Sequence, residues 1–70
     1  MFNTLETYAQ TGKAAAEAMN KKDAGLYDHH KRWLSKALAL ENGEDKKAAR
    51  AAYDAGYTQH RHVPRPLPFA

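Results

Sequence analysis

Residues 23–41 read DAGLYDHHKRWLSKALALE and carry the clearest helical pattern of the chain. Apolar side chains recur in them at three- and four-residue spacing, which places one broad apolar arc on a helix. The members of this arc are Leu26, Tyr27, His30, Trp33, Leu34, Ala37, Leu38 and Leu40. Asp23 can cap the first turn, and Asn42-Gly43 is a typical helix stop because glycine adopts the left-handed conformation. We therefore expect the central helix of the fold here, with its large side chains packed on small residues of its neighbours.

Two further helices are predicted on either side, over residues 3–20 and 44–61. Asn3 and Glu6 have the spacing of a reciprocal cap at the start of the first of these helices. Mostly small residues form its apolar stripe, which consists of Leu5, Tyr8, Ala9, Gly12, Ala15, Ala16 and Met19. The last helix has a narrow face of small residues, formed by Ala48, Ala52, Ala55 and Gly56. Both stripes of small side chains imply a closely packed neighbour.

Composition supports an all-α fold. The chain has one valine and no isoleucine among its 70 residues, while alanine is abundant, so its helix propensity exceeds its strand propensity. We predict one domain, a small three-helix bundle over residues 1–62, followed by an extended proline-rich tail at 63–70. There is no cysteine to reinforce so small a core, and self-association through small-residue or aromatic faces is therefore expected.

The sequence offers few of the residues that enzymes use as nucleophiles, phosphate-binding loops or metal ligands. The chain lacks cysteine, has a single serine, Ser35, and contains no glycine-rich phosphate loop. Its four histidines, His29, His30, His60 and His62, do not have the spacing that places two metal ligands on one helical face. We expect no catalytic residues, no metal and no cofactor.

The segments GLYD at 25–28 and KALAL at 36–40 resemble the second half of a tetratricopeptide repeat. The same spacing is similar to the middle helix of microtubule-interacting and trafficking domains. Both families bind peptides or helical segments in grooves between helices, so the resemblance implies protein binding. The chain departs from the repeat at His30, where a small residue is usual, and at Asn42, where a turn proline is usual.

Two aromatic residues of the last helix mark a predicted protein-binding region. Tyr53 and Tyr57 lie one turn apart, beside His60 and Arg61, and these residue types are common at interface hot spots. Arg65 in the proline-rich tail completes the region. The alternative is that the tyrosines fill the core of the domain.

A basic stripe on residues 22–36 indicates nucleic acid as an alternative partner. Lys22, His29, Arg32 and Lys36 fall on one side of the helix, away from the apolar arc, and could follow a phosphate backbone. The plain alternative is a solvated outer face. The net charge of +3 and the pI of about 9.3 are compatible with both.

The sequence therefore predicts a small, non-enzymatic, cytoplasmic protein that binds another protein or protein complex and no membrane. We expect an accessory or inhibitor protein of the phage or plasmid type, acting on a larger host complex such as a nuclease, a polymerase or a defence machine. The alternative is a small basic nucleic-acid-binding regulator, which would use the stripe of Lys22, His29, Arg32 and Lys36.

Overall fold

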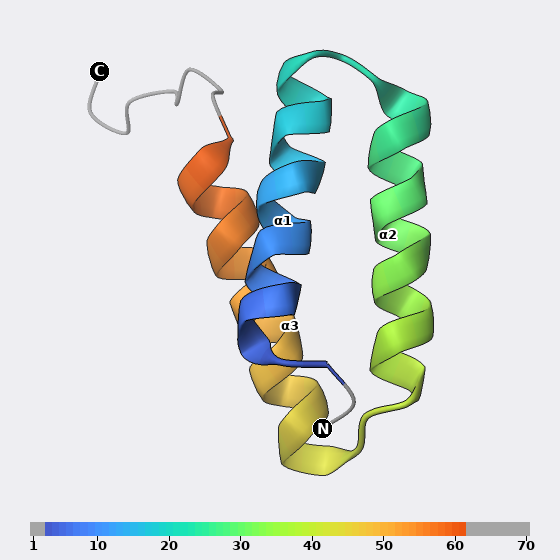
Figure 1. The fold of residues 1–70 in the computed structure, drawn as a ribbon, viewed down its shortest axis with the longest axis vertical. Coiled ribbons are helices and arrows are strands. Elements are labelled where there is room, and N and C mark those ends of the chain that lie inside the picture. The colour runs from blue at the N-terminus through green and yellow to red at the C-terminus, as the bar shows by residue number, and fades with distance from the viewer. Residues whose placement is uncertain (1–2, 62–70) are drawn as a thin grey trace, which may run out of the picture.

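The computed structural model describes residues 3–61, and these residues form three helices and no strands. Helix α1 spans Leu5–Asn20, α2 spans Ala24–Ala39 and α3 spans Gly43–His60. They run up, down and up, with short connections (Figure 1). The prediction of an all-α three-helix bundle is confirmed, while the proline-rich tail at 63–70 lies outside the described residues.

The helix starts follow local capping chemistry. Helix α1 is capped by Thr4, whose hydroxyl accepts a hydrogen bond from the Thr7 amide at 3.1 Å, so the predicted cap at Asn3 is one residue early. Asp23 caps α2 as predicted, and its carboxylate accepts from the Leu26 amide at 3.0 Å. Each cap satisfies an amide that has no partner inside its helix.

The α2–α3 connection differs from the prediction. Helix α2 ends at Ala39, two residues before the expected boundary at residue 41. Gly43 does adopt a positive φ of 43°, but it opens α3 and does not close α2. Its conformational freedom is used to turn the chain from the connection into the new helix.

The closest helix pair is α1 with α3. A Cβ on Gly12 would collide with the backbone oxygen of Tyr53, and a Cβ on Gly56 would collide with the backbone oxygen of Ala9. The two backbones therefore touch where both helices carry glycine. The stripes of small residues predicted on the first and last helices meet at Gly12 and Gly56. The first stripe also receives large side chains of α2 as predicted, since Tyr8 and Ala15 share one core cluster with Leu34.

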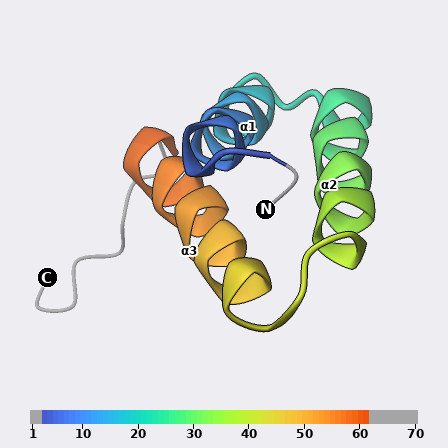
Figure 2. The same cartoon turned by 60° about the horizontal axis from the view of Figure 1, so that its bottom comes forward.

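Helix α1 is consequently the central helix, and the expectation that α2 is central was wrong. Helix α2 packs mainly against α1 and has only a narrow contact with α3. Figure 2 shows α1 between the other two helices, with α2 set apart from α3. The physical reason is that glycine and alanine let α1 and α3 approach closely. The bulkier α2 then packs against α1 alone over most of its length.

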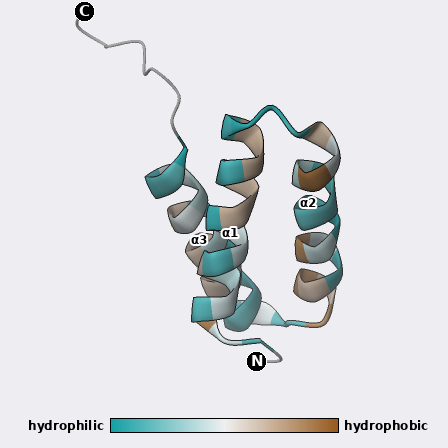
Figure 3. Ribbon diagram, turned by 45° about the horizontal axis from the view of Figure 1, so that its top comes forward, coloured by the Kyte–Doolittle hydropathy of each residue, from teal (hydrophilic) through white to brown (hydrophobic). Residues whose placement is uncertain are grey.

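The core is small and alanine-rich. Its buried members are Tyr8, Ala15, Leu34, Ala37, Ala49 and Tyr53. Brown, hydrophobic positions recur along α2 in Figure 3, and Leu26 and Leu40 at the two ends of this segment are exposed. Among residues 3–61, no helix combines the length and the apolar character needed to cross a membrane.

Candidate interaction surface

Tyr53 belongs to the core and not to an exposed edge. Its side chain is 3% exposed, and its hydroxyl has no hydrogen-bond partner among the described residues. Burial raises the pKa of Tyr53 to about 12, because a phenolate is poorly solvated there. The predicted role of Tyr53 as a contact residue therefore has to be corrected, since a partner cannot reach a buried ring.

Tyr57 lines the same aromatic cluster. Its ring stacks on Tyr53 with centroids 6.4 Å apart and meets Tyr27 of α2 edge-on at 6.2 Å. The ammonium of Lys31 lies 6.0 Å from the Tyr53 ring centroid. These contacts form the narrow junction between α2 and α3, so Tyr57 is half-buried and holds the bundle together.

His60 and Arg61 are also committed to contacts within the chain. The Arg61 guanidinium donates to the Tyr57 hydroxyl at 3.1 Å and to Asn20 Oδ1 at 2.9 Å. The Asn20 amide in turn donates to the His60 backbone oxygen at 2.9 Å, and His60 Nδ1 lies 2.9 Å from the Gly56 oxygen. These hydrogen bonds join the C-terminal end of α3 to the C-terminal end of α1. Arg65, the remaining predicted contact, lies outside the described residues.

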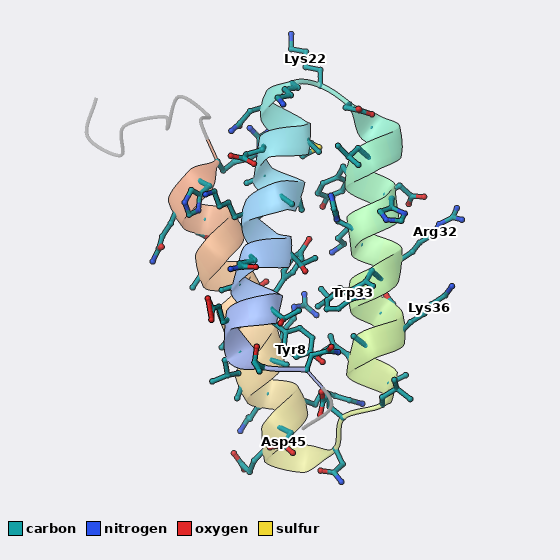
Figure 4. The ribbon with its side chains drawn as sticks, in the orientation of Figure 1. Tyr8, Lys22, Arg32, Trp33, Lys36 and Asp45 are labelled. Atoms are coloured by element: carbon teal, nitrogen blue, oxygen red, sulfur yellow. The ribbon has the colours of Figure 1, made fainter. Side chains whose placement is uncertain are left out.

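Three residues of the predicted basic stripe do gather at one place. His29, Arg32 and Lys36 line a hollow of ≈ 300 Å³ on α2, together with Trp33. In Figure 4, Arg32 and Lys36 point away from the bundle, whereas Trp33 points towards Tyr8. Lys22, the fourth member, stands apart at the α1–α2 turn. The hollow is therefore lined by one aromatic and three basic side chains.

One of those cations is already paired. Arg32 Nε lies 2.8 Å from Asp28 Oδ2, and both side chains are largely exposed. An exposed pair of this kind contributes little to stability, at most about 1 kcal/mol. Its effect at the hollow is to reduce the positive field on the Arg32 side and to leave Lys36 as the unpaired cation among the lining residues.

Exposed leucines flank the hollow at both ends of the helix. Leu26 is 42% exposed and Leu40 is 58% exposed, and each lies seven residues from Trp33. Residues spaced by seven on a helix fall nearly in line, so these three side chains form an apolar ridge. We call the ridge and the three basic residues that line the hollow the α2 outer face: Leu26, His29, Arg32, Trp33, Lys36 and Leu40.

Sequence reasoning had assigned Leu26, Trp33 and Leu40 to the core arc. They do lie at one side of that arc, but α1 covers only its middle, where Leu34 and Ala37 are buried. The ring of Trp33 lies at the edge of the contact between α1 and α2, with its centroid 5.5 Å from that of the Tyr8 ring. The signal that could have revealed the ridge is its seven-residue spacing next to charged residues.

The charge of the protein is concentrated on the same part of the chain. Residues 21–36 hold five of the eleven lysines and arginines but two of the eight acids, which gives +3, the net charge of the whole chain. The remaining six basic residues are balanced by six acids. An anionic partner is therefore attracted to the turn before α2 and to α2 itself.

The histidines are not assembled into a metal centre within residues 3–61, where no group of three potential ligands comes together. The neighbouring His29 and His30 rings have centroids 5.4 Å apart but extend to different surroundings, with His29 exposed and His30 half-buried.

No family model, curated protein or solved structure matches the chain. The resemblance of residues 25–40 to tetratricopeptide-like and trafficking-domain hairpins stays a prediction.

Proposed function

We propose that this protein is a small, non-enzymatic accessory or inhibitor protein that binds another protein through the α2 outer face. The observation that supports this most directly is the exposure of Leu26 and Leu40, at 42% and 58%, on a helix that leans on one neighbour. Leu26 and Leu40 lie in line on the helix with the half-buried Trp33 between them, and apolar residues aligned on one exposed side mark interaction sites more often than scattered ones do. The contact region moves from α3 to α2, because the α3 residues are used to close the bundle.

Its mode of action follows from its size. A 70-residue chain with one exposed helical face can occupy a groove or mask a surface of a larger complex. We place it in the cytoplasm, as a protein of the phage or plasmid type, with a nuclease, polymerase or defence complex as the target.

The second candidate is a nucleic-acid-binding regulator. The concentration of the net charge on residues 21–36 and the position of Trp33 beside Arg32 and Lys36 favour it, since cations and aromatic rings together bind single strands. Two observations oppose it. The Asp28 carboxylate would face the phosphates, and nucleic acid would leave Leu26 and Leu40 uncovered.

A pair of experiments separates the candidates. The first is a mobility-shift titration with duplex and single-stranded DNA and RNA at two salt concentrations. Micromolar binding that weakens steeply with salt would favour the regulator. The second is affinity capture from the native cell with identification by mass spectrometry, followed by a binding measurement with the purified partner.

The capture requires a matched control on the same scaffold. Leu40→Glu alters an exposed residue of the α2 outer face, and Thr58→Glu alters an exposed residue of α3. We expect the first change to abolish capture and the second to preserve it. Equal capture by both variants, or none by the unchanged protein, would refute the proposed surface.

A further inference from the structure

The α2 outer face has the residue order of one half of a coiled-coil seam. Leu26, Trp33 and Leu40 repeat at seven residues, and His29 and Lys36 follow the first two of them by three. Alternating spacings of three and four define the two core positions of a heptad. One set of core positions is thus apolar, and the other is occupied by basic side chains.

We propose that this seam binds an amphipathic helix of a partner protein whose apolar stripe is flanked by aspartate or glutamate. This inference rests on the proposed protein-binding function and specifies the chemistry of the partner. Apolar side chains of the incoming helix pack along Leu26, Trp33 and Leu40, and one of them enters the hollow of ≈ 300 Å³. Its carboxylates pair with His29 and Lys36.

The dimensions suit a single helical segment. From Leu26 to Leu40 the helix rises about 21 Å, so a partner segment of about four turns covers the ridge. A helix that lies along α2 can cover the exposed Leu26, Lys36 and Leu40 next to the positions that α1 covers at Leu34 and Ala37. Trp33 is half-buried against Tyr8, so only the outer part of its side chain is open to a partner.

Charge decides between the possible helical partners. A second copy of this chain would bring Arg32 and Lys36 against the same two cations, and like charges in an interface oppose association. An acidic helix meets the complementary charge of Lys36 at one basic core position and the imidazole of His29 at the other. The excess of +3 on residues 21–36 also speeds the approach of an acidic partner.

Trp33 provides a direct measurement, because it is the only tryptophan in the chain. The probe is an 18-residue helical peptide without tryptophan, with leucine at the heptad core positions and glutamate at the flanking positions. A second peptide carries lysine in place of every glutamate, and a 15-nucleotide oligothymidylate serves as the nucleic-acid probe. Titration at 150 mM salt follows the fluorescence of Trp33.

We expect micromolar binding of the acidic peptide and at least tenfold weaker binding of the basic peptide and the oligonucleotide. Lys36→Glu should weaken binding of the acidic peptide about five- to tenfold and improve binding of the basic one. Lys47→Glu, the same charge change at an exposed residue of α3, should leave both affinities within about twofold. Circular dichroism of each variant is the control that its helices are kept.

Equal affinity for the two peptides, equal effects of the two lysine changes, or tighter binding of the oligonucleotide would overturn this inference. The proposed function fails separately. If captured partners still depend on Leu40 but the acidic peptide does not bind, the protein-binding role stands and the acidic-helix specificity is wrong.

Discussion

The hydroxyl of Tyr8 donates a hydrogen bond to Oε2 of Glu41 at 2.7 Å, across 33 positions of the sequence. Both residues are buried, Tyr8 completely and Glu41 with 5% of its surface exposed. The Asn3 amide donates to the same carboxylate oxygen at 3.4 Å. Burial is the main cause that raises the pKa of Tyr8 above 10. This contact ties the start of α1 to the α2–α3 connection.

Tyr8→Phe should lower the free energy of unfolding by about 1–3 kcal/mol, because the buried Glu41 carboxylate loses one of its hydrogen bonds. Urea denaturation followed by circular dichroism measures the change. The control is Glu44→Gln, which alters an exposed carboxyl group in the same region and should change stability by less than about 0.5 kcal/mol. Equal stability of the two variants would show that the Tyr8–Glu41 contact contributes nothing.

Gly12→Ala and Gly56→Ala should each destabilise the fold by about 2 kcal/mol or more, since the new methyl group meets backbone of the opposite helix. Alanine favours a helix over glycine by up to about 1 kcal/mol, so a loss of stability can only come from the contact between α1 and α3.

Gly25→Ala is the matched control for these two substitutions. Its Cβ would meet only Asp23 Oδ1, at 3.7 Å, and the variant should be about 0.5–1 kcal/mol more stable than the unchanged protein. Thermal unfolding of all three variants gives the comparison. If Gly12→Ala also proves stabilising, the two helices do not touch at this point.

Tyr53→Phe should raise the free energy of unfolding by up to about 1 kcal/mol, because it removes a buried hydroxyl that has no partner within residues 3–61. Tyr57→Phe should act in the opposite direction, since the Tyr57 hydroxyl accepts from Arg61 at 3.1 Å. Chemical denaturation of the two variants at neutral pH provides the test, and the same sign for both would contradict it.

Alkaline pH should unfold the protein partly through Tyr53. The pKa of Tyr53 is about 12 in the folded chain against 10.0 for an ordinary tyrosine, so folding favours the protonated hydroxyl. Its stabilising effect is complete below pH 10 and is lost as the pH rises from 10 towards 12. The stability of Tyr53→Phe should fall less steeply over this range, and a parallel fall in both proteins would exclude Tyr53 as the cause.

Arg61→Ala should loosen the last turn of α3 with little effect on global stability. The substitution removes the guanidinium that binds Tyr57 and Asn20, but these contacts are only partly buried. We expect faster amide exchange at residues 57–60 and a loss of about 1 kcal/mol or less. Arg50→Ala, which breaks an exposed pair with Asp54 in the middle of α3, should leave exchange at residues 57–60 unchanged.

Much of the local structure was encoded in neighbouring residues. Alanine content and three- and four-residue spacing predicted three helices, the cap at Asp23, and helix ends at Asn20 and close to residue 61. The spacing also predicted that His29, Arg32 and Lys36 lie on one side of α2, because the direction of side chains around a helix repeats with a known period. These features depend on separations of a few residues, which the sequence displays directly.

The arrangement of the helices was decided only in the tertiary structure. Periodicity shows which side of a helix is apolar, but it does not show which neighbour covers that side. The contact of Gly12 and Gly56 with the opposite backbone made α1 central, buried Tyr53, and left Leu26 and Leu40 at the margin of the bundle. Each of these outcomes joins residues far apart in the chain, and their close packing arises only when the whole fold is assembled.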